Sequence, residues 1–328
     1  MGSLALLFVP GLAWAQGGSP SFTDVPPARE EFSAIEELKR RGILEGRPDG
    51  TFGPDAFVNR AEAVTIVVRA VANVRNLPLL SRCFPDVQTS EWYVQPICYA
   101  ADLEWVSGYP DGTFQPIRTV SKGEFLKILL QAYGIDTEPL RAFEEALASD
   151  AEDPHQWYFP YLTYALASSM THADTFGNVN PGIALTRGQV ALLTHRFLLY
   201  REGGRAQELL TEAEKDMRLA FAKLDALELH QAAYAVTRVR IMAWGASERI
   251  PDTAVVRATV QLGEALSSLI QAYRSMEQAN FTDGLQAAQT AYRLADEADA
   301  LGGEVQIYTD KIRSYAHELA DAIRAHQQ

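Results

Sequence analysis

Motifs of histidine-based and serine-based catalysis are missing from this sequence. The six histidines of the 328-residue chain show no His-Glu-x-x-His or other paired-ligand spacing, and there is neither a Gly-x-Ser-x-Gly motif nor a glycine-rich phosphate loop. The Asp-Gly turns lack the alternating acidic ligands and the distal glutamate of a calcium-binding EF-hand. We therefore expect a protein that is not an enzyme and that needs no cofactor and no metal ion.

Positive charge is also scarce. The chain has 29 lysines and arginines against 42 aspartates and glutamates, a net charge of −13, and the excess of acid extends over both its N-terminal and its C-terminal parts. Binding of nucleic acid needs a concentrated basic surface. We expect no nucleic-acid partner.

Long apolar runs are absent after the N-terminus, where a membrane-spanning helix would need about 20 apolar residues. The N-terminal run is shorter and ends in Ala13-Trp14-Ala15, a pattern typical of a signal peptide cut after Ala15. The basic region that normally precedes such a run is missing, so either the start codon is misplaced or the chain is truncated. A buried N-terminal helix is the alternative. We expect residues 1–15 to be a signal peptide of a secreted protein without a membrane span.

Cysteine occurs only twice, as Cys83 and Cys98. Two thiols without a neighbouring histidine pair do not make the usual four-ligand zinc site. In an exported chain the two could instead form a disulfide, which would stabilise the folded state by about 3 kcal/mol in the loop-entropy model. Two free, buried thiols are the alternative.

The sequence does contain an internal repeat. Each copy has a turn-forming segment with proline, followed after a few residues by a polar segment, and the copies are offset by 62 and then by 65 residues. Such a period indicates one supersecondary unit used three times. The paired segments are 47–54 with 58–62, 109–116 with 120–124, and 176–181 with 185–189.

Each polar segment predicts a helix start. A short polar residue is followed three positions later by Glu or Gln, which is the capping box that satisfies free amides of the first helical turn. Apolar stretches at 64–71, 125–133 and 190–200 come next, so we expect a helix in each. The three boxes are Asn59 with Glu62, Ser121 with Glu124, and Thr186 with Gln189.

A cation stands at the first position of each predicted helix, as Arg60, Lys122 and Arg187. It opposes the helix macrodipole at a cost of roughly 0.3–1 kcal/mol, and the same conflict in three copies suggests a use. A helix N-terminus favours anions, and an added cation would make a carboxylate or phosphate pocket there. The alternative is a solvated surface charge that packs only its aliphatic stem.

These motifs resemble S-layer homology domains. Units of that family begin with Phe-x-Asp-Val, pass a loop of the form Gly-x-x-Asp-Gly-Thr-Phe-x-Pro and enter a helix through Thr-Arg-Ala-Glu. Here the openings at 22–25 and 84–87, the loop glycines Gly46 and Gly108 and the three helix starts match that pattern. The resemblance covers roughly residues 22–201.

The copies depart from the family pattern in places. Copy one has Glu30 where the other two have Trp92 and Trp157, and copy three has lost the Asp-Gly turn. Copy three also lacks the Phe-x-Asp-Val opening, which leaves Asp150 or Asp153 as a substitute for its aspartate.

The resemblance implies a pseudo-threefold array of helix-loop-helix repeats at 22–76, 83–137 and 148–201, with a groove between neighbours. It implies secondary cell-wall polysaccharide as the ligand, typically pyruvylated, with the ketal carboxylate on the cation and a sugar face on an aromatic ring. Arginine can grip a carboxylate with two hydrogen bonds, so the grooves of Arg60 and Arg187 should bind more strongly than that of Lys122. The implied glycan-binding residues are Asp24, Gly46, Arg60, Asp86, Trp92, Gly108, Lys122, Asp150, Trp157 and Arg187.

Residues 204–328, which we call the tail, have a different character. Apolar residues alternate at spacings of three and four, as in packed or coiled helices. Breaks near Gly245, where Pro251 suits a new first turn, around 280–284 and at 302–303 divide the tail into four expected helices, in an antiparallel bundle or short stalk.

The sequence therefore predicts a mainly α protein that is secreted to the cell wall or S-layer and anchored non-covalently to polysaccharide. The tail would act as a spacer, bind another envelope protein or self-associate. The alternative is a wall-attached, glycan-active enzyme whose catalytic part is the tail.

Overall fold

The computed structural model describes residues 20–72, 77, 83–302 and 304–326. This part of the chain is mainly helical, which confirms the predicted fold class, and its only strand pairing is a few isolated bridges. The predicted signal peptide, residues 1–15, lies outside it. None of the described helices is both long and apolar enough to cross a bilayer.

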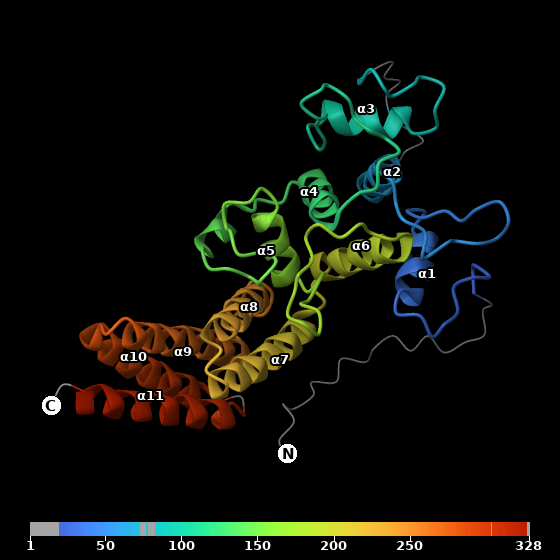
Figure 1. Cartoon of the computed structure of the whole chain (residues 1–328). Coiled ribbons are helices and arrows are strands. Elements are labelled where there is room, and N and C mark those ends of the chain that lie inside the picture. Colours follow the sequence, from blue (N-terminus) through green and yellow to red (C-terminus); the bar gives the residue numbers. More distant parts are fainter. Residues whose placement is uncertain (1–19, 73–76, 78–82, 303, 327–328) are drawn as a thin grey trace.

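Each of the three copies contributes a short helix, a loop and a second helix (Figure 1). All three predicted capping boxes are confirmed, with both reciprocal hydrogen bonds present in each. A 3-10 turn, Glu138–Ala142, lies between copies two and three. The helices are α1 (Phe32–Arg40) and α2 (Arg60–Val71) in copy one, α3 (Val94–Asp102) and α4 (Lys122–Ala132) in copy two, and α5 (Phe159–Ala167) and α6 (Arg187–Arg201) in copy three.

Three short extended segments, one before the second helix of each copy, pair into a closed ring. The amide of Val58 donates to the carbonyl of Leu185 (2.9 Å), that of Leu185 to Val120 (3.1 Å), and that of Val120 to Val58 (3.1 Å). The three side chains are almost fully buried at the centre of the ring. Copy three, the most degenerate in sequence, is therefore as necessary to the closure as the other two.

Helix packing around the ring follows the same cyclic order. The second helix of each copy packs against the first helix of the next: α2 against α3, α4 against α5, and α6 against α1. Each junction between copies thus joins a helix start from one copy to the opening segment of another.

The tail contains five described helices, not the four expected. The first expected helix is divided at residues 226–228, where Leu227 takes a left-handed conformation with φ of +59°. That turn contains neither glycine nor proline, so no sequence signal marks it. Consecutive tail helices pack on each other. They are α7 (Ala206–Asp225), α8 (Leu229–Ser247), α9 (Ala254–Glu277), α10 (Phe281–Leu301) and α11 (Gln306–His326).

The tail is docked on copy three, and one hydrophobic core runs from the array into α7 and α8 through Leu209, Leu210 and Met242. Gly245, expected at a helix break, lies within α8 and sits so close to α5 that a Cβ atom there would be 1.7 Å from the carbonyl oxygen of Ala167. The close approach of two helix backbones, and not a turn, explains this glycine.

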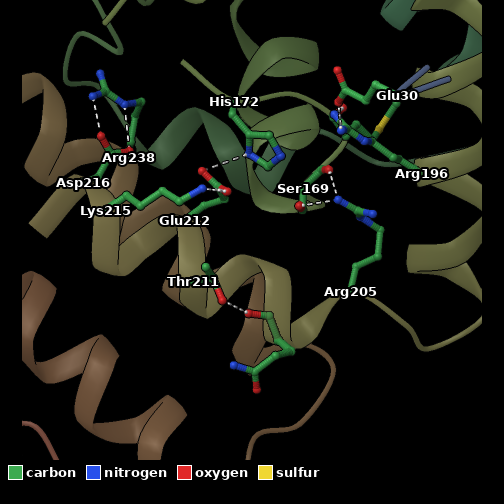
Figure 2. Close-up of polar contacts among 12 residues, drawn as sticks. Glu30, Ser169, His172, Arg196, Arg205, Thr211, Glu212, Lys215, Asp216 and Arg238 are labelled. Carbon is green, nitrogen blue, oxygen red and sulfur yellow. Dashed lines mark hydrogen bonds and ion pairs between the residues drawn. The ribbon is translucent and has the colours of Figure 1, made fainter. Parts of the chain in front are cut away.

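Polar contacts reinforce the docking (Figure 2). Arg238 on α8 is 1% exposed and grips Asp216 on α7 with two hydrogen bonds of 2.9 and 2.6 Å, while its third nitrogen donates to the carbonyl of Leu147, the residue just before copy three. Arg205, at the start of α7, donates to the carbonyl and hydroxyl of Ser169. The tail is therefore held in a fixed orientation on the array.

Cys83 and Cys98 are joined in a disulfide, with their Cα atoms 5.2 Å apart. The bond ties the opening segment of copy two to α3.

Candidate functional site

The three junctions between copies are the candidate sites, and we number them by the copy whose second helix they contain. The first junction joins the start of α2 to the opening of copy two, the second joins α4 to copy three, and the third joins α6 to copy one. The residue two positions before the first helix of each copy differs among them: it is Trp92 in the first, Trp157 in the second and Glu30 in the third.

The backbone amides at the helix starts are already occupied by the neighbouring copy. In α2 the amides of Arg60 and Ala61 donate to the carbonyls of Arg118 and Pro116. Equivalent pairs serve α4 and α6, and the capping residue satisfies the third amide of each helix. The expectation that helix-end amides would bind an incoming anion is therefore wrong, and any anion at a junction must be held by side chains.

Arg60 reaches across the first junction to copy two. It is 7% exposed, its Nη2 donates to the carbonyl of Ser107 at 2.8 Å, and its guanidinium lies over the rings of Phe114 and Tyr109 at 4.6 and 5.1 Å. Burial lowers the pKa of Arg60 from its ordinary value. Its Nε atom is fully buried and has no hydrogen-bond partner in the described chain.

Arg187 reaches copy one in the same manner across the third junction. Its Nε and Nη2 donate to the carbonyls of Phe52 (2.9 Å) and Glu45 (3.1 Å), and its Nη1 is 3.4 Å from the carboxylate of Glu62. All three nitrogens of this guanidinium therefore already have partners.

Lys122 spans the second junction. Its ammonium donates to the carbonyl of Val179 at 2.9 Å and to the hydroxyl of Thr171 at 3.4 Å, and burial lowers its pKa. The alternative of a solvated surface charge is therefore wrong for all three cations. Each one is largely buried and binds the loop of the next copy, which explains why a cation stands at every helix start.

The predicted aspartates organise the loops. The carboxylate of Asp24 accepts hydrogen bonds from the amides of Phe52 and Gly53 at 2.8 and 2.7 Å. Burial acts to raise the pKa of Asp24, but these two bonds hold it below its ordinary value. Asp86 accepts from two loop amides of copy two in the same way.

Copy three uses Asp150 as its aspartate. Asp150 accepts from the amides of Val179 and Asn180 at 3.0 and 2.6 Å, as Asp24 and Asp86 do in their loops. Asp153 instead accepts from the amide of His155 and is not the counterpart.

The loop glycines allow close packing of an aromatic ring. A Cβ atom on Gly46 would be 2.2 Å from Phe22, and one on Gly108 would be 2.9 Å from Phe84. The aspartates and the glycines thus shape the loops, while the tryptophans and cations face the junctions.

The two tryptophans among the predicted site residues are exposed. Trp92 is 58% exposed and Trp157 is 50% exposed, and each stacks edge-on against the tyrosine that follows it. Trp157 also lies against Gly123 at the start of α4, with the ammonium of Lys127 5.9 Å from its ring. An exposed ring face fixed beside a cation can hold a sugar ring and a carboxylate together.

The third junction has ion pairs where the others have a tryptophan. Glu30 accepts a hydrogen bond from Arg196 at 2.7 Å (Figure 2), and Arg29 grips Asp55 with two bonds of 3.0 and 2.6 Å. Within the described ranges, this junction therefore offers neither an exposed indole ring nor a free arginine donor on Arg187.

Three further residues at the first junction were not anticipated. Arg118, whose side chain is 44% exposed, bonds to Glu124 at 2.6 Å, and the hydroxyl of Tyr109 donates to the same carboxylate. Arg118 also contacts the hydroxyl and the ring of Tyr109. The sequence signal was an arginine in copy two where copies one and three have Ala56 and Ile183. A second arginine therefore stands near Arg60.

This chain is similar to proteins named for the cell wall, the surface layer and cellulosome anchoring. The profile of the S-layer homology domain matches residues 21–64 and 84–126, which lie in copies one and two. The chain is similar to the Middle cell wall protein of Brevibacillus brevis, 26% identical over 153 residues, covering 46% of this chain and 14% of that protein. It is 28% identical to the Surface-layer 125 kDa protein of Lysinibacillus sphaericus over 167 residues, covering 50% and 14%.

A third relative is the Cellulosome-anchoring protein of Acetivibrio thermocellus, 33% identical over 88 residues, which cover 26% of this chain and 20% of that protein. In all three comparisons the matched region spans a fifth of the relative or less.

Proposed function

The chain belongs, through copies one and two, to the S-layer homology domain family, and from this we propose that its junctions bind secondary cell-wall polysaccharide. We propose that it anchors to the cell wall at the cell surface, which its likeness to S-layer and anchoring proteins supports. The proposal concerns the finer points: which glycan it binds, by which junction, and what the tail does.

The first junction carries the proposal. It combines the exposed ring of Trp92 with the accessible guanidinium of Arg118, which shares the ring of Tyr109 with Arg60. A pyruvylated sugar offers a carboxylate for an arginine and an apolar ring face for an indole. We therefore infer that the ligand is an anionic, pyruvate-bearing glycan.

The junctions should bind unequally. The second has an exposed tryptophan but only the point charge of Lys122, and that ammonium is engaged with Val179 and Thr171. The third lacks a tryptophan, and all of Arg187's nitrogens have partners. We propose that the first binds most tightly and the third least, which revises the sequence-based ranking for Arg187.

For the tail we propose a non-catalytic role as a rigid extension that carries an interaction with another protein. The continuous core and the Arg238 contacts support this, because they hold the tail at one angle to the array. A partner bound there would be held at a defined distance from the wall.

Sedimentation of the full-length protein with purified cell-wall sacculi tests the anchor. The protein should pellet with sacculi that retain their secondary polysaccharide and stay in solution with sacculi stripped of it. Trp92→Ala should reduce pelleting, whereas Tyr292→Ala, which removes an exposed aromatic residue of α10, should not. Equal pelleting with stripped sacculi would refute the polysaccharide assignment, and release of sugars by the protein would support the catalytic alternative.

A further inference from the structure

A groove of about 620 Å³ lies where the tail meets copy three. Helices α8, α9 and α10 form most of its wall, and residues 145 and 146, in the segment just before copy three, complete it. Its volume lies within the range of natural ligand sites, roughly 300–1,000 Å³. We propose that this groove, which we call the tail groove, binds an extended peptide segment of another protein through a single carboxylate.

Unused polar groups line the tail groove. Arg274 is partly buried and forms no side-chain hydrogen bond or ion pair with any described residue, and the side chains of Ser267, Ser268 and Gln286 likewise have no hydrogen-bond partner in that part of the chain. Most arginines on neighbouring helices are paired. Four spare side chains on one concave surface provide a cation, two hydroxyls and an amide for a ligand.

The wall of the groove is held in place before any ligand arrives. Arg240 bridges Glu145, in the segment just before copy three, at 2.7 Å, and Glu264 of α9, at 2.9 Å. The hydroxyl of Tyr234 donates to Glu152 of copy three at 2.7 Å. These contacts fix α8 and α9 against the array, so a ligand would not have to order the site.

Charge around the groove favours a ligand with one carboxylate. Arg274 is its unpaired cation, while Glu145 and Asp283 place carboxylates at its rim. A polyanion would be repelled by these two, but a single carboxylate directed at Arg274 would form a charge-assisted hydrogen bond. The C-terminal carboxylate of a peptide or a lone acidic side chain fits this requirement.

The lining favours a peptide over a glycan. Sugars bind on the faces of aromatic rings, and the one ring among the lining residues is Tyr234, whose hydroxyl is held by Glu152. The amide of Gln286 can both donate to and accept from a peptide backbone. Ile270 and Ala287 provide apolar surface for small side chains.

This inference gives the proposed protein interaction of the tail a location, and it rests on that part of the proposed function alone. The first junction and the tail groove share no residue. Glycan anchoring and peptide binding should therefore fail independently.

The test uses the full-length protein and an array of short synthetic peptides, each present with a free and with an amidated carboxyl terminus. The wild-type protein should bind a subset of the peptides, all of which carry a carboxylate. Arg274→Gln should weaken binding to that subset about ten- to a hundredfold. Arg293→Gln is the matched control, because this arginine of α10 lies outside the groove and pairs with Glu297. Trp92→Ala should leave peptide retention unchanged, and Arg274→Gln should still pellet with sacculi.

A second variant covers the case in which Arg274→Gln alters folding. Ala287→Trp would fill the groove while leaving Arg274 unreplaced, and it should abolish peptide binding. The melting temperature of each variant verifies that it is folded. The proposal is overturned if the wild-type protein binds none of the synthetic peptides, or if Arg274→Gln binds the same peptides as the wild type. It is also overturned if Arg274→Gln loses sacculus binding while folded, since the groove would then be a glycan site.

Discussion

Replacing Arg238 with methionine should destabilise the whole molecule, because this residue joins α7, α8 and the segment that leads into copy three at one buried point. The substitution leaves the carboxylate of Asp216 without its two hydrogen bonds and the carbonyl of Leu147 without its donor. Removing one partner of a buried ion pair typically costs about 3–5 kcal/mol. We expect a loss of that size in the free energy of unfolding at neutral pH.

The loss should depend on pH with a definite sign. Burial already raises the pKa of Asp216, although Arg238 partly offsets that effect. Without the arginine this pKa should rise further, so the folded variant binds a proton that the unfolded chain releases above its ordinary pKa near 3.8. Stability of the variant relative to wild type should therefore be least reduced in acid and should fall as the pH rises.

Chemical denaturation of the full-length protein, followed by circular dichroism and by tryptophan fluorescence, measures this effect. Because the core is continuous from the array into the tail, we expect the transitions of the two signals to shift together. The double variant Arg238→Met/Asp216→Leu should recover much of the loss, since it removes the unpaired charge. A loss below about 1 kcal/mol, or a shift confined to one signal, would refute the view that Arg238 unites the tail with the array.

Three further predictions concern single groups. Arg60→Ala should weaken glycan binding by about ten- to a hundredfold, more than Lys122→Ala does. It should also lower the free energy of unfolding, because the carbonyl of Ser107 loses its hydrogen-bond donor. Unchanged glycan affinity in both variants would show that the cations are not part of the binding site. Mass measurement of the secreted protein should show Cys83 joined to Cys98, and reduction of this disulfide should lower the melting temperature. Thiols that can be alkylated in the native secreted protein would contradict this. Burial lowers the pKa of His172 to about 4 from its ordinary value of 6.5, so below pH 6.5 the unfolded chain binds a proton that the folded protein does not. The contribution of His172 to the free energy of unfolding should therefore be complete above about pH 6.5 and should fall by at most about 3 kcal/mol as the pH drops toward 4. His172→Gln should flatten that profile, and the exposed His230→Gln should not.

Local chemistry explains what could be predicted from the sequence. A capping box consists of two residues three positions apart, and the Asp-Gly turn of neighbours, so both are visible in one stretch of chain. The cations at the helix starts were visible too, but their partners are carbonyls supplied by the next copy. No local pattern contains those carbonyls, and an arrangement that links the copies was interpreted as a vacant anion pocket.

The tail shows the same limit. Heptad spacing identified its helical character, but the turn at Leu227 has no glycine or proline to mark it. Gly245 carried a signal that sequence alone could not interpret, because a glycine suits a helix end as well as a close contact between helices. Arg238 resembles any surface arginine until the fold places Asp216 and Leu147 around it.

The closed ring of Val58, Leu185 and Val120 also constrains the order in which the protein can fold. A chain that emerges from a ribosome or a translocation pore presents copies one and two first, when the ring has no third segment. In that state the amides of Lys122 and Gly123 lack their acceptors, Ile183 and Pro181, and the amide of Val58 lacks Leu185. Pairings between such distant segments form slowly. The array should therefore remain open, and suited to transport as an unfolded chain, until copy three has emerged and closes it.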